Sequence, residues 1–265
     1  MNVLYCADSN VCVGIALSAL SIVQQTNTAL NVFILTARIE QKAPVPRSFA
    51  DNLERSLRLK NKDSCVTLID ITDKFEGYVP LANMSTRFTP FCMLRLFADK
   101  VDLIPDKVLY LDTDVICFAD ITSLYETELY GFDVAGVPDR YGKWFFGNIL
   151  KHDYLNSGVL LMNMKSIREN GLFEKCRRLC RDKKMFMPDQ SAINKLAVKK
   201  KLAARYNDQR SVGKDTALRH YTTFFRLFPY VRPVTVKPWQ IERMHKILKT
   251  HELDELISEY ERMFG

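Results

Sequence analysis

The sequence predicts an α/β protein with a mixed, mostly parallel central sheet flanked by helices. First, strand-like and helix-like segments alternate along the N-terminal half, which is typical of βαβ units. Second, short apolar runs rich in β-formers, such as 108–111, have the pattern of strands buried on both faces. Third, acidic residues directly follow several of these runs, as at Asp8, Asp112 and Asp139. Because parallel sheets bind ligands at the carboxyl ends of their strands, we expect a site at this edge.

In the N-terminal part, apolar runs alternate with segments whose apolar residues have helical spacing. Either Ser9 or Asn10 is the expected N-cap of the first helix, and Arg95 lies on the last helix of this part. The strands are expected at 3–6, 31–36 and 65–70, and the helices at 11–25, 47–59 and 86–100.

The second half continues with the same two patterns. A turn at 156–158 is expected to lead into a strand that ends at 163, and Asp189 is the expected N-cap of a helix that begins near 188. Further strands are expected at 108–111 and 132–137, and helical segments at 166–183 and 240–263. We therefore expect one domain over 1–240 and a C-terminal helical extension over 241–265 that packs on or beside it.

The chain of 265 residues carries a net charge of +7, and its pI is about 9.0. The basic excess is concentrated in 175–201, where a solvated helix face is the default explanation. An anionic membrane surface or a phosphorylated substrate are the functional alternatives. Nucleic acid is not an expected partner, because no nucleic-acid-binding module is visible.

The cysteines and the N-terminus indicate where the protein works. Seven cysteines, among them Cys65, Cys92 and Cys117 in apolar runs, suggest reduced, buried thiols in a cytoplasmic protein. Cys176 and Cys180 are interpreted as packing residues of a helix. The chain enters a strand-like run at once, which leaves no room for a signal peptide, and it has no apolar run long enough to span a membrane.

The Asp-x-Asp motif Asp112-Thr113-Asp114 is the strongest candidate for chemistry. It continues a buried strand, and in an extended segment residues two apart project to the same side, so the two carboxylates can converge. Converging carboxylates are unfavourable unless a positive charge lies between them, and a hard divalent cation that also holds phosphate oxygens suits this place. Alternatively, the two residues merely end a strand and start a turn.

Seven ordered pieces of the chain resemble glycosyltransferase family 8, which includes bacterial transferases of lipopolysaccharide and surface glycans and, more distantly, glycogenin. The resemblance extends from residue 1 to about 240. The matching pieces are Ala-Asp-Ser-Asn at 7–10, Leu-Arg-Leu at 94–96, Val-Leu-Tyr-Leu-Asp-Thr-Asp-Val at 108–115, Leu-Asn-Ser-Gly-Val-Leu-Leu at 155–161, Asp-Gln at 189–190, His-Tyr at 220–221 and Lys-Pro-Trp at 237–239.

This resemblance implies a GT-A (Rossmann-like) fold and a retaining hexosyltransferase with Mn²⁺ (or Mg²⁺) as cofactor. The donor would be UDP-galactose or UDP-glucose, and the acceptor a glycan or a glycoprotein. By position, Asp112, Asp114 and His220 would be the metal ligands, a set that suits Mn²⁺ better than Ca²⁺. The location would be cytoplasmic, with peripheral contact to the inner face of an anionic membrane as a further possibility.

The resemblance also implies which residues bind the donor. Asp8 and Asn10 would hold uracil and ribose, although their simpler role is helix capping. Arg95 would reach phosphate or sugar hydroxyls, and its simpler role is that of an exposed helix charge. The full implied donor set is Ala7, Asp8, Asn10, Arg95, Asp112, Thr113, Asp114, Asp139, Asn156, Ser157, His220 and Lys237.

Gln190 and Asp189 are the expected catalytic residues. Gln190 would lie nearest the anomeric carbon, and because an amide is a poor nucleophile we expect a front-face mechanism. In that mechanism the leaving phosphate accepts the acceptor's proton and the carbonyl dipole of Gln190 stabilises positive charge. Asp189 would hydrogen-bond the sugar hydroxyls. It is also the obvious nucleophile for the alternative, a double displacement.

One segment departs from the family pattern. Lys237 follows His220 by 17 positions, whereas the two usually share one short loop. The aromatic and basic insertion at 222–236 either keeps Lys237 in place as a structured insertion or replaces it, with Arg226 or Arg232 as substitutes. The insertion is expected to frame the acceptor site, and a membrane contact or a dimer patch are alternatives.

Two other classes of protein compete with this interpretation. A metal-dependent nucleotidyltransferase would use a similar sheet and carboxylate pair, but no Gly-rich phosphate loop follows the first strand. A non-catalytic sugar-nucleotide-binding subunit ranks last, because no part of the constellation is missing. For the transferase, replacing Asp112 or Asp114 by Asn is expected to abolish transfer and to leave the fold intact.

Overall fold

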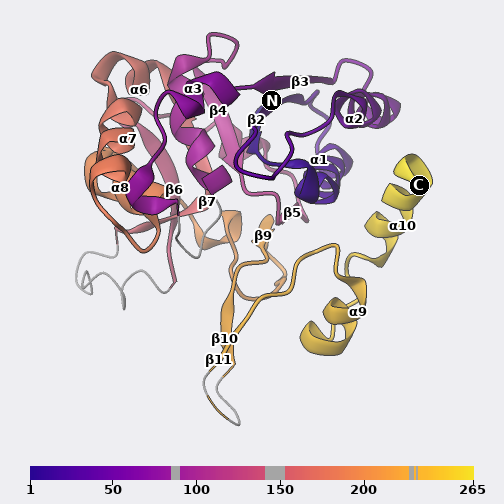
Figure 1. The fold of residues 1–265 in the computed structure, drawn as a ribbon. Coiled ribbons are helices and arrows are strands. Elements are labelled where there is room, and N and C mark those ends of the chain that lie inside the picture. Colours follow the sequence, from indigo (N-terminus) through magenta and orange to yellow (C-terminus); the bar gives the residue numbers. More distant parts are fainter. Residues whose placement is uncertain (85–89, 141–152, 227–229, 231) are drawn as a thin grey trace.

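The computed structural model describes residues 1–84, 90–140, 153–226, 230 and 232–265 (Figure 1). Its central sheet has seven strands in the order β3-β2-β1-β4-β7-β6-β8. These strands are β1 (Asn2–Cys6), β2 (Asn31–Thr36), β3 (Cys65–Asp70), β4 (Lys107–Leu111), β6 (Val134–Pro138), β7 (Leu155–Asn163) and β8 (Lys199–Lys201).

The sheet is mixed and mostly parallel, as predicted. Strand β1 is parallel to β2 and β4, β2 is parallel to β3, and β6 is parallel to β8. Only β7 runs against its neighbours, β4 and β6. Strands β4 and β6 therefore point the same way, and β7 begins where they end. This topology brings Asp112, Asp139 and Asn156 to one edge of the sheet.

Helices cover both faces of the sheet (Figure 1). Residues of β1 alternate between the two apolar layers: Val3 and Tyr5 pack on one side, Leu4 and Cys6 on the other. The first layer contains α1 (Cys12–Gln25), α2 (Arg47–Lys60) and α10 (Asp254–Phe264). The second contains η3 (Pro90–Lys100), α6 (Met164–Asn170), α7 (Leu172–Asp182) and α8 (Pro188–Leu196). Short helical elements are η1 (Ser9–Val11), α3 (Thr72–Glu76), η2 (Leu81–Asn83), α4 (Thr122–Tyr125) and η4 (Ala204–Tyr206).

The helix expected at 86–100 is a 3₁₀ helix over Pro90–Lys100, and residues 86–89 lie outside the described part of the chain. Its buried residues are Phe91, Met93, Leu94, Arg95, Leu96, Phe97 and Ala98. A 3₁₀ helix has three residues per turn, so Phe91, Leu94 and Phe97 lie on one face.

The single helix expected at 166–183 is two helices, α6 and α7. They meet at Gly171, whose φ of 65° is in the left-handed region that favours glycine and ends α6. The side chain of Asn170 then accepts a hydrogen bond of 2.8 Å from the backbone N–H of Leu172, at the start of α7. The break lets each helix place its own apolar face against the sheet.

Three local predictions about strand and helix starts are wrong. Residues 156–158 belong to β7, because the strand already pairs with Pro138 of β6 at Leu155. Asp8, rather than Ser9 or Asn10, caps the first helical turn by accepting from the Asn10 N–H at 3.0 Å. Asp189 lies inside the first turn of α8, which begins at Pro188, a residue whose fixed φ suits this position.

The C-terminal segment is helical in three pieces rather than one. It consists of α9 (Ile241–Arg243), the π-helical turn η5 (Met244–Leu248) and α10. Lys249 ends η5 in the left-handed conformation, with a φ of 56°, which separates this turn from α10. Helix α10 packs on α1 and α2, where the rings of Phe49 and Phe264 are 5.9 Å apart.

All seven cysteines have free thiols. Cys176 and Cys180 are buried in the apolar layer of α7, as predicted, whereas Cys65 and Cys92 are only half-buried. The basic stretch at 175–201 is not wholly a solvated face, because Arg177 is buried and its Nη2 lies 3.1 Å from Asp99 Oδ2. Within the described residues, no helix combines the length and apolar character needed to span a bilayer.

Candidate active site

The two carboxylates of the Asp-x-Asp motif come from a turn rather than from an extended segment. The backbone N–H of Val115 donates to the carbonyl of Asp112 at 3.1 Å, which closes the turn between β4 and β5 (Val115–Cys117). Strand β5 pairs with β9 (Leu218–His220), and this pairing sets Val115 opposite His220. The expected extended geometry is wrong, but the turn still directs both carboxylates towards His220.

Asp112, Asp114 and His220 form a compact group of potential ligands. The Nε2 atom of His220 lies 3.2 Å from Asp114 Oδ1 and 3.6 Å from Asp112 Oδ2. One ligand atom from each residue lies within 4.8 Å of the others. Asp114 and His220 are buried and Asp112 is half-buried, so the group is shielded from most of the solvent.

The remaining oxygen of each carboxylate is held by a protein cation. Asp114 Oδ2 is paired with the ammonium of Lys237. Asp112 Oδ1 lies 3.0 Å from Arg95 Nη2 and accepts a hydrogen bond of 2.6 Å from the Tyr110 hydroxyl. Each carboxylate therefore has one oxygen fixed by the protein, and the other oxygen faces the imidazole of His220.

The orientation of His220 is set from behind by Asn156. The Nδ1 atom of His220 lies 3.1 Å from Asn156 Oδ1, so it is Nδ1 that carries the proton and donates. The amide of Asn156 donates in turn to Asp139 Oδ2 at 2.8 Å, and Asn207 donates to Asn156 Oδ1 at 2.9 Å. This network fixes the ring so that Nε2 is directed at the two carboxylates.

The charges of this group shift its pKa values in opposite directions. Burial opposes the ionisation of Asp114, but Lys237 and His220 outweigh it and lower its pKa. Burial alone would lower the pKa of His220, yet Asp114 and Asp112 raise it. The pKa of Lys237 is likewise raised, because Asp114 outweighs the cost of burying the ammonium. Asp114 is thus a carboxylate at neutral pH, which is the form that binds a cation.

These residues fit a divalent metal ion. Two carboxylate oxygens and one imidazole nitrogen form a mixed donor set that suits first-row transition ions such as Mn²⁺ better than Ca²⁺. The fit is also steric, since a Cβ atom added at Gly158 would meet His220 Cε1 at 2.1 Å and Asp112 Oδ2 at 2.9 Å. Only glycine therefore allows β7 to pass this close behind the ligand atoms.

Arg95 is a buried organising residue. Its side chain is 1% exposed, so the alternative of an exposed helix charge is wrong. Besides Asp112, its guanidinium lies 3.2 Å from Asp189 Oδ2, donates to the Ser157 carbonyl and stacks on the ring of Tyr110 at 3.8 Å. Arg95 thus ties the Asp-x-Asp turn to α8 and β7.

Asp189 and Gln190 reach the same cavity from the start of α8. The Oε1 atom of Gln190 accepts from the Ser157 N–H at 2.9 Å, and its Nε2 lies 3.3 Å from Asp139 Oδ2. Asp189 is buried, and the Cys92 side chain and the Gln190 backbone donate to its carboxylate. Its Oδ2 lies 3.2 Å from Arg95 Nε but accepts no hydrogen bond from the described residues, because that N–H donates to the Cys92 carbonyl. Burial raises the pKa of Asp189, and Arg95 offsets only part of this effect.

The described residues of the segment at 222–236 form two paired strands. They form the hairpin of β10 (Phe224–Arg226) and β11 (Arg232–Val234), which projects from the rest of the fold (Figure 1). The hydroxyls of Thr223 and Thr235 lie 2.7 Å apart at its base, and Lys237 still reaches Asp114. Residues 227–229 and 231 are outside the described part, as is the side chain of Arg226, while Arg232 lies on the exposed Tyr230 ring.

Four predicted donor residues do not line this cavity. Asp8 directs both carboxylate oxygens at Asn10, and Ala7 is buried, where its N–H donates to Leu35. Thr113 lies against α1, since a Cβ added at Gly14 would meet its carbonyl at 2.5 Å. Ala7, Asp8, Asn10 and Thr113 are therefore absent from the residues that line the cavity.

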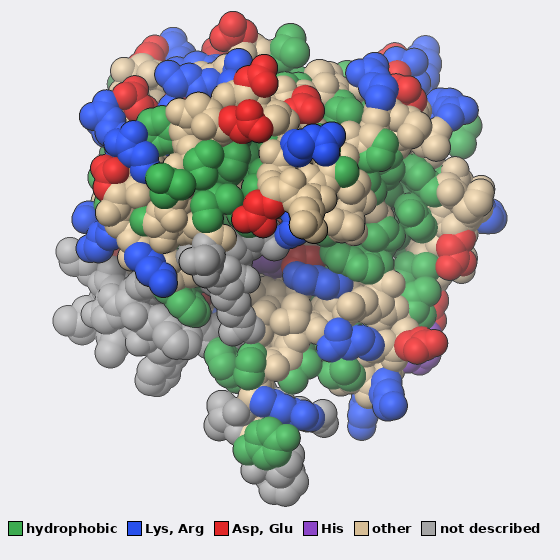
Figure 2. Space-filling model, viewed as in Figure 1, with side chains coloured by type: hydrophobic (Ala, Val, Ile, Leu, Met, Phe, Trp, Pro, Cys, Tyr) green, Lys and Arg blue, Asp and Glu red, His purple; other side chains and the backbone are tan. Residues whose placement is uncertain are grey.

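The other predicted residues share one cavity of about 240 Å³. Figure 2 shows this face hollowed near its centre, where histidine, acidic and basic side chains gather. Seven residues of the cavity wall were not predicted from the sequence. Among them, only Gly158 lies in a predicted motif, Asn-Ser-Gly at 156–158. The predicted lining residues are Arg95, Asp112, Asp114, Asp139, Asn156, Ser157, Asp189, Gln190, His220 and Lys237; the unpredicted ones are Cys92, Gly158, Phe186, Met187, Thr222, Thr223 and Phe225.

The sheet order, the two helical layers and the acidic motif at the end of β4 define a glycosyltransferase of the GT-A fold. The chain belongs to glycosyl transferase family 8, whose sequence model matches residues 2–242.

Two curated relatives and two solved structures illustrate the similarity. The chain is 26% identical over 282 residues to a lipopolysaccharide 1,2-glucosyltransferase of Escherichia coli K12, which covers 96% of this chain and 77% of the relative. It is 30% identical over 124 residues to glycosyltransferase GlyF of Streptococcus pneumoniae, 45% of this chain and 28% of GlyF. The galactosyltransferase LgtC, solved with donor and acceptor sugar analogues, superposes with a TM-score of 0.73 at 19% identity, covering 100% of this chain and 97% of LgtC. GlyE of Streptococcus pneumoniae superposes with a TM-score of 0.62 at 22% identity, covering 90% of this chain and 56% of GlyE.

Proposed function

We propose that this glycosyltransferase is a retaining enzyme that moves glucose or galactose from a UDP-sugar to a glycan or glycoprotein acceptor, assisted by Mn²⁺. The observation that carries the proposal is the convergence of Asp112, Asp114 and His220 with the ammonium of Lys237 in one cavity. A diphosphate is the ligand that such a site suits, because it can bind a divalent ion and an ammonium at once.

Asp112 Oδ2, Asp114 Oδ1 and His220 Nε2 are the atoms that would hold the ion. The ion would supply Lewis-acid neutralisation of the charge that develops on departing UDP. Lys237 would act on the same charge as a fixed ammonium, which it can do because its pKa is raised rather than lowered. Arg95 is proposed as a positioning residue, since its guanidinium is occupied by Asp112, Asp189 and Ser157.

Asp189 and Gln190 are proposed to hold the transferred sugar. Asp189 Oδ2 is buried, is charge-paired with Arg95 and accepts no hydrogen bond from the described residues, so a sugar hydroxyl could donate to it. The ion pair with Arg95 occupies the oxygen that a double displacement would need, which favours the front-face mechanism. In a front-face reaction the acceptor oxygen bonds to the anomeric carbon, the bond to UDP breaks, and the leaving phosphate takes the acceptor's proton.

The acceptor and the location are proposed from the relatives and from the surface of α7. A lipopolysaccharide glucosyltransferase among the relatives supports a surface-glycan acceptor. Arg178 and Arg181 are exposed on α7, which supports a cytoplasmic enzyme in peripheral contact with an anionic membrane. Asp8 and Asn10 remain the proposed uracil and ribose contacts, for which Asp8 would have to exchange a hydrogen bond from Asn10.

Isothermal titration of the chain with UDP, in Mn²⁺ and in EDTA, tests the proposal. We expect binding that weakens at least about tenfold without metal, because the ion links the carboxylates to the diphosphate. A donor-hydrolysis screen over UDP-sugars then identifies the hexose. Equal UDP affinity in Mn²⁺ and EDTA would contradict the metal-assisted mechanism, and hydrolysis of neither UDP-glucose nor UDP-galactose would contradict the donor class.

A further inference from the structure

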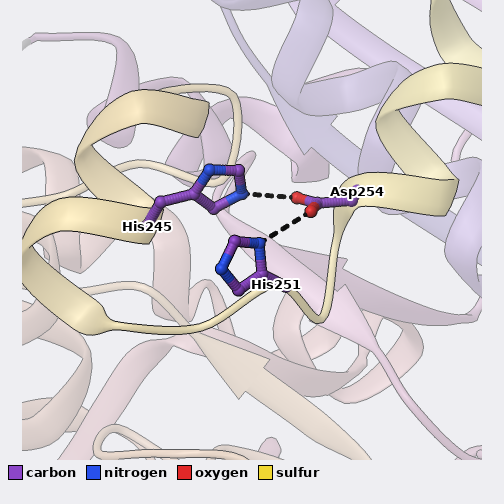
Figure 3. A group of neighbouring side chains, drawn as sticks. All are labelled: His245, His251 and Asp254. Atoms are coloured by element: carbon purple, nitrogen blue, oxygen red, sulfur yellow. Dashed lines mark hydrogen bonds and ion pairs between the residues drawn. The ribbon is translucent and has the colours of Figure 1, made fainter.

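A second group of possible metal ligands lies in the C-terminal segment. His245 belongs to η5, His251 to the following loop, and Asp254 to the first turn of α10. In Figure 3 the two imidazoles converge on the carboxylate from η5 and from the loop. His245 Nε2 lies 2.7 Å from Asp254 Oδ1, and His251 Nδ1 lies 2.9 Å from Asp254 Oδ2.

This group is separate from the proposed active site. None of its three residues lines the cavity of Asp112, Asp114 and His220, and the transfer reaction needs none of them. It is also far more accessible, because the His251 side chain is 70% exposed and that of Asp254 is 45% exposed. A dissolved ion can therefore reach it without any opening of the fold.

The donor atoms are of the right type for zinc, and one ligand atom from each residue lies within 4.8 Å of the others. Two imidazole nitrogens and one carboxylate oxygen, with an open position for water, are a common zinc ligand set. Ligands at about 2.0–2.1 Å in a tetrahedral site are separated from each other by about 3.3 Å. The observed separations of 2.7 and 2.9 Å are shorter because protons now bridge these atoms, and a small outward movement of the exposed His251 accommodates an ion.

We infer that His245, His251 and Asp254 form a second metal site, which binds Zn²⁺ or a similar imidazole-preferring ion with water as the fourth ligand. The ion would take the place of the hydrogens on His245 Nε2 and His251 Nδ1, which would pass to the other nitrogen of each ring or to water. Mg²⁺ and Ca²⁺ are disfavoured, since both prefer oxygen ligands. The site thus differs in metal preference from a donor site that two carboxylates dominate.

The ion would close a loop that supports the active site. Glu252 lies between His251 and Asp254, and its Oε1 accepts from the Tyr221 hydroxyl at 2.6 Å and is paired with Arg219. These two residues flank His220, and the N–H of Tyr221 donates to the Asp114 carbonyl at 3.0 Å. A metal clasp across 245–254 would therefore hold Glu252, and through it β9, in the position that His220 requires.

Zinc titration of the whole chain against a chromophoric chelator tests this inference. Because the Asp112, Asp114 and His220 group can also take zinc, the titration uses His220→Ala as background. We expect one equivalent of bound Zn²⁺ in His220→Ala and none in His220→Ala combined with His251→Ala. Lys246→Ala, an exposed neighbour in η5, is the matched control and should keep that equivalent.

Two further measurements make the result independent of folding defects and of the transferase reaction. Zn²⁺ at one hundred times Kd should raise the Tm of His220→Ala by about 5 °C, and this shift should vanish in the double variant. Asp254→Asn should weaken zinc binding at least about tenfold. Equal zinc binding with and without His251 would overturn the inference. The group would then be only two histidines hydrogen-bonded to a carboxylate.

Discussion

The two histidine–aspartate groups of this chain are built in opposite ways. Asp112, Asp114 and His220 meet through the pairing of β5 with β9, more than a hundred residues apart in the sequence, and Asp114 and His220 are each 7% exposed. His245, His251 and Asp254 come from one short stretch, and their side chains are 33%, 70% and 45% exposed. The first group depends on the whole fold, whereas the second depends on one loop.

The difference shows how the protein neutralises two neighbouring carboxylates. In the buried group each carboxylate has its own cation, Arg95 for Asp112 and Lys237 for Asp114. In the exposed group the single carboxylate of Asp254 is hydrogen-bonded by two histidines. Removing a buried partner should therefore affect both activity and stability, and removing an exposed partner should affect neither strongly.

The largest effect is expected from Asp114→Asn. It removes a proposed metal ligand and leaves the ammonium of Lys237 without its partner, so transfer should fall about 10³-fold. From the sequence alone we expect an intact fold; the ion pair instead predicts a loss of about 1–2 kcal/mol in unfolding free energy, moderated because Lys237 is 33% exposed. Donor turnover and urea unfolding in EDTA measure the two effects. Wild-type stability would mean that this ion pair contributes nothing.

Gly158→Ala should break the buried group without touching a charge. The new Cβ would overlap His220 Cε1 at 2.1 Å, and His220 must then move away from Asp112. We expect Mn²⁺ affinity and transfer to fall about 10–100-fold and unfolding free energy to fall by about 1–3 kcal/mol. Gly213→Ala is the matched control, since its Cβ would meet only Thr216 Oγ1 at 3.6 Å. Equal Mn²⁺ affinity in both variants would contradict the close approach.

Arg95→Lys tests whether the buried cation positions Asp112, Asp189 and Ser157. Lysine keeps the charge but cannot reach Asp112, Asp189 and the Ser157 carbonyl together, because it lacks the planar fork of arginine. We expect kcat to fall about tenfold or more with a smaller change in donor KM, since the proposed role of Arg95 is to position other groups. A purely structural role would instead lower stability and leave kcat per folded molecule unchanged, as urea unfolding with active-site titration would reveal.

The pKa of Asp189 predicts a pH effect on stability. Burial raises this pKa above its ordinary value, so the folded state binds a proton more tightly than the unfolded state. The resulting stabilisation is complete below the unfolded pKa and is lost as pH rises through the folded pKa. Relative to Asp189→Asn, the wild type should therefore gain unfolding free energy as pH falls from 7 to the unfolded pKa of about 4. An unchanged difference between the two would contradict the raised pKa.

The smallest effect is expected at the exposed group. In EDTA, His251→Ala should change the free energy of unfolding by less than about 0.5 kcal/mol, because it removes only a solvent-exposed hydrogen bond to Asp254. Urea unfolding in EDTA and in Zn²⁺ gives the comparison. A large loss in EDTA would show that this loop, like the buried group, depends on its internal contacts.

The sheet and much of the cavity follow from the sequence for a simple reason. Apolar β-formers define the strands, and the polar residue after each strand defines the ligand-binding edge, as at Asp112 and Asp139. Helical spacing alone does not distinguish a 3₁₀ helix from an α-helix at 90–100. It also does not show that Gly171 divides a helical segment in two.

Other features of the site have no local signal. The burial of Arg95 depends on three partners that are distant in sequence, and the contribution of Phe186 and Phe225 to the wall depends on α8 and the hairpin meeting one cavity. Asp8 and Asn10 show the reverse, because their position after β1 is as predicted but their side chains bind each other. Long-range packing decides these cases.

The hairpin of β10 and β11 is joined to the rest of the fold at a narrow base. Its strands enter and leave the fold side by side, clasped by Thr223 and Thr235, so its outer part can lengthen, shorten or be exchanged without moving His220 or Lys237. A hairpin exchanged between Thr223 and Thr235 would therefore alter the cavity wall at Phe225, whereas Asp112, Asp114 and His220 come from other elements.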